Sequence, residues 1–152
     1  MLYFAYGSNM DGVQMKERCP SHEFRGTGFI TDYRLDFTHY AAHRKGGAAD
    51  IVPEGDARVW GVLYDISNED IEALNRFEGM GLQPPVYRHA SVNITHETNR
   101  NDSMTDAYAY EIITKSGPFK PSRNYMRHLL DGARMWGLPE SYIAMLKAIQ
   151  TP

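Results

Sequence analysis

The sequence predicts an α+β protein in which a mixed, mostly antiparallel and barrel-like sheet is surrounded by peripheral helices. Extended runs of apolar and aromatic residues dominate the earlier part of the chain, and strong helical periodicity is confined mainly to residues 122–149. The polar segment Asn99–Ser103 separates two strand-like runs, which is typical of a hairpin and hence of antiparallel pairing. No linker, repeat or low-complexity tract interrupts residues 1–152, so we expect a single domain.

The stretch Leu2–Asn9 is the one around which we expect the chain to be organised. Leu2–Tyr6 is bulky and apolar enough for a buried strand, and Gly7-Ser8-Asn9 then favours a tight turn. The apolar positions in Met10–Arg18 indicate a short helix after the turn. A strand that enters a helix in this way leaves backbone N–H groups unpaired, and such groups can bind an anion or a carbonyl oxygen. An ordinary strand end would have the same residues.

The next segments predict further strands. Phe24–Phe37 ends in an alternating pattern typical of a half-buried strand, whereas Thr38–Lys45 lacks a clear period and is interpreted as a loop. Ala48–Val52 is again an extended run, and Pro53–Asp56 has the residues of a turn. Ala57–Ile66 is apolar on both faces, which predicts a central strand that is covered on both sides.

A helix and a strand hairpin are expected in the middle of the chain. Ser67 is a good helix N-cap, and the helix should stop near Gly79 because glycine readily adopts the left-handed conformation that ends helices. The strands of the hairpin are Val86–Thr95 and Thr105–Thr114, on either side of the polar loop.

The last part of the chain predicts two helices. Residues 116–122 contain two prolines and are interpreted as an ordered loop. Ser122 is a good N-cap for a helix that runs through Trp136, where Gly137 follows. Pro139 then begins a final helix through Ile149, because proline is tolerated in the first turn of a helix.

Composition and charge exclude several classes of protein. The net charge is -3, which gives no general attraction to nucleic acid or to an anionic membrane. No apolar run is long enough to span a bilayer, and the N-terminal residues lack the pattern of a signal peptide. Cys19 is the only cysteine, so an intrachain disulfide is excluded and a reducing compartment is favoured. We therefore expect a cytoplasmic protein with no nucleic-acid or membrane partner.

Several motifs together resemble the γ-glutamylcyclotransferase-like (AIG2-like) family. The first is Tyr3–Asn9, which reads Y-F-A-Y-G-S-N. The other matching blocks, in chain order, are Leu35-Asp36-Phe37, Gly46–Ile51, Val59–Tyr64, Leu74–Gly79, Val86-Tyr87, Gly137-Leu138-Pro139 and Leu146–Ile149. One such block would be a weak signal, whereas this many blocks in register over nearly the whole chain are specific. The resemblance implies the same small mixed barrel.

The resemblance implies a catalytic role for Glu78, which precedes Gly79 in the motif L-x-x-x-E-G. Without it, a glutamate beside a glycine is usually an exposed helix end. In the family, this glutamate is the general base and acid of an intramolecular reaction. The α-amino group of a γ-glutamyl unit attacks its own γ-carbonyl, which releases 5-oxoproline and an amine or amino acid. A carboxylate within hydrogen-bond reach can take the ammonium proton and return it to the leaving nitrogen.

The resemblance also implies a set of residues that bind the substrate, a small γ-glutamyl molecule. These residues are Tyr6, Gly7, Ser8, Asn9, Tyr87, Tyr110 and Tyr125. The first four form the turn that would grip the γ-glutamyl group, with backbone N–H groups near the developing oxyanion. The three later tyrosines match aromatic positions around the family's pocket, although core packing explains each of them as well. The family needs no metal or organic cofactor, and His39 and His43 lack a third ligand at convincing spacing for zinc.

Three functions remain open on the sequence alone. The chain is a cyclotransferase for free γ-glutamyl amino acids or amines, an enzyme that trims a γ-glutamyl group from a larger metabolite, or a non-catalytic small-molecule-binding protein of the same fold. Glu78 argues against the third, and Asn9 argues against the glutathione-specific branch, which has another residue after Tyr-Gly-Ser. Leu82–Pro85 replaces a shorter family segment, so the leaving group is undefined. The oligomeric state, monomer or homodimer, is open too.

Overall fold

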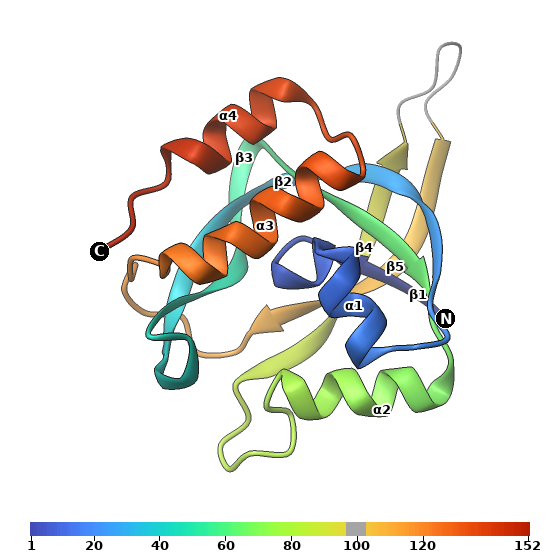
Figure 1. Cartoon of the computed structure of the whole chain (residues 1–152), viewed down its shortest axis with the longest axis horizontal. Coiled ribbons are helices and arrows are strands. Elements are labelled where there is room, and N and C mark those ends of the chain that lie inside the picture. The colour runs from blue at the N-terminus through green and yellow to red at the C-terminus, as the bar shows by residue number, and fades with distance from the viewer. Residues whose placement is uncertain (97–102) are drawn as a thin grey trace.

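The computed structural model describes residues 1–96 and 103–152. In these residues, five strands close into a barrel in the order β1-β3-β2-β4-β5 (Figure 1). The strands are β1 (Leu2–Ala5), β2 (Glu23–Ala41), β3 (Gly46–Asp65), β4 (Tyr87–His96) and β5 (Ser103–Ile112). Neighbouring strands pair antiparallel except β1 and β5, which pair in parallel where the barrel closes. The predicted fold class is therefore confirmed.

The prediction of a loop at Thr38–Lys45 is wrong for its first half. Strand β2 continues to Ala41, since Tyr40 pairs with Gly47 of β3. Only a 3-10 turn, η2 (Ala42–Arg44), connects the two strands. The segment has no period of its own, and it is held as a strand by pairing with β3, a partner that periodicity does not reveal.

The predicted turn at Pro53–Asp56 does not end a strand, so this prediction is also corrected. Strand β3 runs through it, but the pairing jumps from Arg58 opposite Thr31 to Pro53 opposite Tyr33, so residues 54–57 bulge out of the ladder. The left-handed residues here are Asp56 and Asp32, with φ of 65° and 64°. Aspartate tolerates this conformation, and the Asp56 N–H donates to Asp32 Oδ1 at 3.2 Å. Turn chemistry thus produces a bulge.

Four α-helices surround the barrel in the described part of the chain: α1 (Gly12–Arg18), α2 (Asn68–Phe77), α3 (Arg123–Met135) and α4 (Glu140–Ala148). In Figure 1, α3 and α4 lie over one side of the barrel and α2 lies on the other, with α1 between them. The predicted caps are confirmed: Ser67 forms a capping box with Asp70, and Ser122 accepts the Tyr125 N–H at 3.1 Å. Gly79 and Gly137, both with φ of 70°, follow the ends of α2 and α3.

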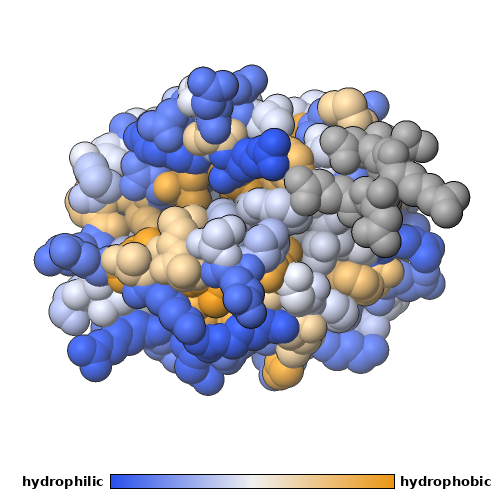
Figure 2. Space-filling model, turned by 90° about the horizontal axis from the view of Figure 1, so that it is seen from above, coloured by the Kyte–Doolittle hydropathy of each residue, from blue (hydrophilic) through white to orange (hydrophobic). Residues whose placement is uncertain are grey.

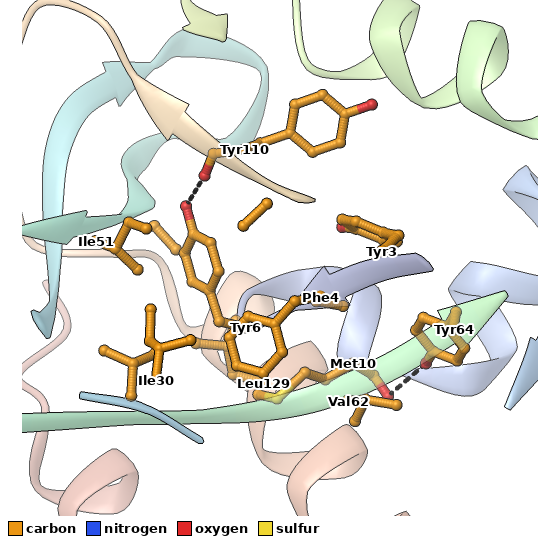
Figure 3. Packing of buried hydrophobic residues seen from close by; sticks show 14 of the residues in the cluster. Tyr3, Phe4, Tyr6, Met10, Ile30, Ile51, Val62, Tyr64, Tyr110 and Leu129 are labelled. Atoms are coloured by element: carbon orange, nitrogen blue, oxygen red, sulfur yellow. Dashed lines mark hydrogen bonds between the residues drawn. The ribbon is translucent and has the colours of Figure 1, made fainter. Parts of the chain in front are cut away.

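Large side chains from the strands and α3 fill the interior. Phe4 of β1, Ile30 of β2, Tyr64 of β3 and Leu129 of α3 are fully buried and belong to the one hydrophobic cluster that Figure 3 shows in part. Burying a side chain of this size stabilises a fold by about 1.5–3 kcal/mol. The outer face in Figure 2 is largely hydrophilic, with apolar areas separated by polar side chains. No described helix is both long and apolar enough to cross a membrane.

The predicted hairpin loop at Asn99–Ser103 lies outside the described residues except for Ser103, with which β5 begins. The strands on both sides of it pair as expected, from Tyr87 opposite Ile112 to His96 opposite Ser103. This pairing aligns Tyr87 and Tyr110 near one end of the hairpin, beside the C-terminal end of α2.

Candidate active site

The turn after β1 is a short 3-10 helix, η1 (Ser8–Met10), followed directly by α1. The Met10 N–H donates to the Gly7 carbonyl and the Asp11 N–H to the Ser8 carbonyl, both at 3.1 Å. The backbone N–H groups of Ser8 and Asn9 donate no hydrogen bond to any of the described residues. The expected strand, turn and helix are therefore present, with free donors at the turn.

Side chains fix the conformation of this turn. Gln14 Nε2 donates to Ser8 Oγ and to Asn9 Oδ1, each at 2.9 Å. The nitrogen of the Asn9 amide, Nδ2, donates to the Tyr3 hydroxyl at 3.0 Å. Because Ser8 and Asn9 are themselves buried, these bonds hold the turn in one arrangement.

Helix α3 supports the turn from behind. Gly132 packs so closely that an added Cβ would lie 2.3 Å from the Met10 carbonyl carbon, so only glycine allows this approach. Trp136 Nε1 donates to the Met10 carbonyl oxygen at 2.9 Å, and His128 Nδ1 lies 2.6 Å from Asp11 Oδ2. Residues more than a hundred positions apart in the chain thus fix one end of η1.

Glu78 and the turn line the same cavity, which has a volume of about 580 Å³. It is the C-cap residue of α2, immediately before the left-handed Gly79. The same cavity is lined by every residue that the sequence predicted for the site: Tyr6, Gly7, Ser8, Asn9, Tyr87, Tyr110 and Tyr125. Segments from both ends and the middle of the chain therefore meet at one place.

The surroundings of Glu78 favour its neutral form. Burial raises the pKa of Glu78 from 4.5 to about 7, and Arg18 and then Arg44 act in the opposite direction as nearby positive charges. No described residue donates a hydrogen bond to its carboxylate. The group is therefore able to exchange a proton near neutral pH.

The hydroxyls of Tyr6 and Tyr110 donate their protons to the protein, which leaves none for a ligand. The Tyr6 hydroxyl donates to the backbone oxygen of Tyr110, as Figure 3 shows. The Tyr110 hydroxyl donates to Asn75 Oδ1 of α2 at 2.7 Å. Because Asn75 lies in the last turn before Glu78, this second bond connects β5 to the segment that carries the carboxylate.

The other two tyrosines bind the backbone of Ala49 in β3. The Tyr87 hydroxyl donates to the Ala49 carbonyl at 2.7 Å, and the Tyr125 hydroxyl accepts the Ala49 N–H at 3.1 Å. Burial raises the pKa of Tyr125 to about 12, so it keeps its proton at neutral pH. That proton has no acceptor among the described residues, which leaves Tyr125 as a donor available to a ligand.

Sequence reasoning missed three residues of the site. Gln14 and Arg18 lie four positions apart on α1 and so share the helix face that meets the turn. Arg18 Nη1 donates to Asn9 Oδ1 at 3.1 Å, and Arg44 Nη2 lies 3.4 Å from Ser8 Oγ. The spacing of Gln14 and Arg18 was a usable signal, whereas nothing local to Arg44 indicated its place.

The remaining candidate groups contribute little chemistry. His39 and His43 line the cavity, but the described residues contain no group of three potential metal ligands. Cys19 is fully buried, and burial raises the pKa of its thiol to about 12, so it stays protonated and unreactive. The cavity combines one carboxylate with a pKa near neutrality, free backbone donors, and the guanidinium groups of Arg18, Arg44 and Arg76.

Known proteins with a similar sequence and fold are named as enzymes. The sequence profile of the AIG2-like family matches residues 58–146, a range that contains Glu78. The γ-glutamylcyclotransferase of Mus musculus is 31% identical over 98% of this chain and 78% of its own length. That of Bos taurus is 31% identical with the same coverage. A solved structure of a γ-glutamyl cyclotransferase superimposes with a TM-score of 0.91 at 28% identity, over 100% of this chain and 89% of that one.

Proposed function

The chain belongs to the AIG2-like, γ-glutamylcyclotransferase family, and from this premise we propose that it cyclises a γ-glutamyl amino acid or amine to 5-oxoproline. The observation that carries the proposal is the single cavity shared by the Glu78 carboxylate and the Ser8–Asn9 backbone donors. Residues 1–152 act as one domain in this proposal, and the reaction takes place in the cytoplasm without a metal or organic cofactor.

Glu78 is proposed to move the proton. The α-ammonium of a γ-glutamyl unit has a reference pKa of about 8, and it must lose a proton before its nitrogen can attack. A carboxyl group with a pKa of about 7 is well matched to accept that proton near neutral pH. The nitrogen then bonds to the γ-carbonyl carbon and gives up a second proton as the ring amide forms. The bond from that carbon to the leaving nitrogen breaks, Glu78 passes one proton to the leaving nitrogen, and the other proton reaches the released amine through solvent.

The turn is proposed to stabilise the oxygen that becomes negative. When the nitrogen adds, the γ-carbonyl oxygen becomes an oxyanion, and fixed backbone N–H groups stabilise it without having to reorganise. The N–H groups of Ser8 and Asn9 are such donors, and the bonds from Gln14 hold them in place. The free proton of Tyr125 provides a further donor, because this hydroxyl lies close to Gly7.

The reaction also requires the substrate to adopt a folded conformation. Ring closure demands that the amino nitrogen and the γ-carbonyl of one flexible molecule approach each other, and proximity of this kind contributes up to about 7–11 kcal/mol to an intramolecular reaction. The aromatic walls formed by Tyr87 and Tyr110 are rigid, since their hydroxyls are bonded to the protein. A rigid wall can hold a folded substrate better than a mobile one.

A second candidate, removal of a γ-glutamyl group from a larger metabolite, is favoured by one feature. A further hollow of about 700 Å³ adjoins the cavity and shares Arg18, His43, Arg44 and Phe77 with it. Such space would accommodate a leaving group larger than a simple amine. The chemistry at Glu78 is the same in both cases.

The test is a panel of γ-glutamyl dipeptides and γ-glutamyl amines incubated with the purified protein. We expect 5-oxoproline and the free amine or amino acid to form in equal amounts from at least one member. If every compound of the panel binds and none is cyclised, the protein is a binding protein of this fold and the proposal is wrong.

A further inference from the structure

Among the charged side chains that line the cavity of Glu78 and the hollow beside it, positive ones outnumber negative ones. Arg18 and Arg44 line both spaces, Arg76 lines the first, and Lys45 lines the second. The carboxylates in the two linings are those of Glu78 and Glu17. The whole chain carries a net charge of -3, so this positive balance is a local property of the site. A local excess of one charge attracts a ligand of the opposite charge.

The two shared guanidinium groups have only neutral hydrogen-bond partners. Arg18 donates to the side-chain oxygen of Asn9, and Arg44 donates to those of Ser8 and Gln14, at 3.4 and 3.3 Å. Within the described residues, neither makes an ion pair with a carboxylate. Their charges are therefore available to an anion that enters the site.

Aromatic rings hold both groups in position. The Arg18 guanidinium lies 4.3 Å from the centre of the Phe77 ring, and that of Arg44 lies 5.2 Å from the centre of the Tyr125 ring. Stacking of this kind restricts a long side chain before any ligand binds, so less entropy is lost on binding. His43 adds no charge beside them at neutral pH, because burial and then Arg44 lower the pKa of its imidazole.

The charges of a γ-glutamyl substrate account for only part of this arrangement. Its γ-glutamyl half carries one ammonium, which would face Glu78, and one α-carboxylate. A single carboxylate leaves one guanidinium without an ionic partner. Both groups contact the turn, Arg18 at 3.1 Å from Asn9 Oδ1 and Arg44 at the longer distance of 3.4 Å from Ser8 Oγ. Their chain neighbours in the hollow distinguish them, because Lys45 beside Arg44 is positive and Glu17 beside Arg18 is negative. The residues on both sides of Arg44, His43 and Lys45, line the adjoining hollow.

Resting on the proposed function, we propose that Arg44 is a specificity-determining residue that binds a carboxylate on the leaving group. The substrates are then γ-glutamyl amino acids or γ-glutamyl peptides with a free carboxylate, in preference to γ-glutamyl amines. The leaving group runs from Glu78 past Arg44 into the second hollow, where Lys45 adds to the attraction.

The experiment compares γ-glutamyl-alanine with γ-glutamyl-alaninamide, which differ only in a carboxylate and a neutral amide. The quantity is the ratio of their kcat/KM values. In the parent protein we expect γ-glutamyl-alanine to be preferred about tenfold or more, the factor typical of a hydrogen bond to a charged group. Arg44→Gln should bring the ratio close to one, and Arg44→Lys should restore part of it because the charge returns without the planar fork.

The ratio isolates the leaving group. Arg44 also influences Glu78 and contacts Ser8, but both substrates share the γ-glutamyl half, so those effects cancel. Arg134→Gln is the matched control: it removes the same charge from an exposed site in α3 that lines neither space, and it should leave the ratio unchanged.

A parent ratio near one overturns the inference, and so does an Arg44→Gln variant that keeps the parent ratio. If neither compound yields 5-oxoproline, the proposed function fails, and calorimetric binding of the same two compounds decides the inference separately. Tighter binding of the carboxylate than of the amide, lost in Arg44→Gln, supports a role for Arg44 as an anion-binding residue. Equal binding overturns it.

Discussion

Gly7 lies directly against Tyr125: a Cβ atom placed on Gly7 would stand 3.4 Å from the Tyr125 hydroxyl oxygen and 3.3 Å from Cβ of Ala49. The turn and the helix α3 therefore meet at the wall of the cavity with no room for a branched side chain. The backbone at Gly7 has a negative φ of -109°, so space rather than a left-handed conformation is what requires glycine here.

This contact predicts the effect of Gly7→Val. The valine methyl groups would displace the turn or the Tyr125 hydroxyl, and a misplacement of about 1 Å in an active site can lower activity about 10²-fold. We expect kcat/KM to fall by about that factor while the far-ultraviolet circular dichroism stays that of the parent. Gly55→Val is the control, because an added Cβ there meets nothing within 4 Å. Full activity in Gly7→Val would show that the turn is merely the end of a strand.

Substitution of the carboxylate separates chemistry from binding. Glu78→Gln keeps the size of the side chain but cannot accept and return a proton, so single-turnover formation of 5-oxoproline at saturating substrate should fall by about 10²–10⁴-fold. Some affinity should be lost too, because an amide attracts the substrate's ammonium less. Glu72→Gln, an exposed position on the same helix, serves as control and should cyclise at the parent rate. If Glu78→Gln cyclises the substrate at the parent rate, Glu78 is not the group that transfers the proton and the proposed mechanism is wrong.

The raised pKa of Glu78 also predicts a pH-dependent cost to stability. Its pKa is about 7 in the folded protein and near 4.5 when exposed, so the folded state binds the extra proton between these values. Below pH 4.5 the carboxyl is protonated in both states and costs nothing. Above pH 7 the carboxyl is charged in both states. The free energy of unfolding is then lower by roughly 3 kcal/mol than below pH 4.5, at about 1.4 kcal/mol per pKa unit.

Glu78→Gln, which stays neutral, should therefore be more stable than the parent at pH 8, and the difference should shrink as the pH falls toward 5. Urea unfolding of both proteins at pH 5, 6, 7 and 8 measures it, because contributions from other groups cancel in the difference. A difference that is constant with pH would mean that the pKa of Glu78 is not raised.

Removal of Arg18 should shift the pH dependence of activity. Arg18 is the stronger of the two positive charges that lower the pKa of Glu78, so Arg18→Gln should raise that pKa further. The rising limb of kcat/KM against pH reports the free enzyme's base, and we expect it to move up by about one unit. Arg134→Gln should leave the limb where it is. A limb that stays in place in Arg18→Gln, whatever the absolute rate, would show that Arg18 does not act on Glu78.

Local sequence determined most of the elements that carry the site. The apolar run of β1, the small polar residues after it, the Ser67 cap and the Gly79 stop each act on their immediate neighbours, so their effects can be predicted from the order of residues. This is why the turn at residues 6–9 and the position of Glu78 at the end of α2 were predicted correctly. The resemblance to a known family, rather than spacing, indicated that these two places belong to one site.

Only the tertiary structure decided which further side chains reach the site and which hydrogen bonds they make there. Arg44 reaches Ser8 because β2 extends to Ala41 and pairs with β3, and that pairing also overrode the loop expected at residues 38–45. The hydroxyl of Tyr110 is bonded to Asn75, whereas the proton of Tyr125 is free, a distinction that no property of either residue type reveals. Contacts between distant segments have no periodicity along the chain, and the charge state of Glu78 depends on all of them together, since burial and two arginines from different elements set its pKa.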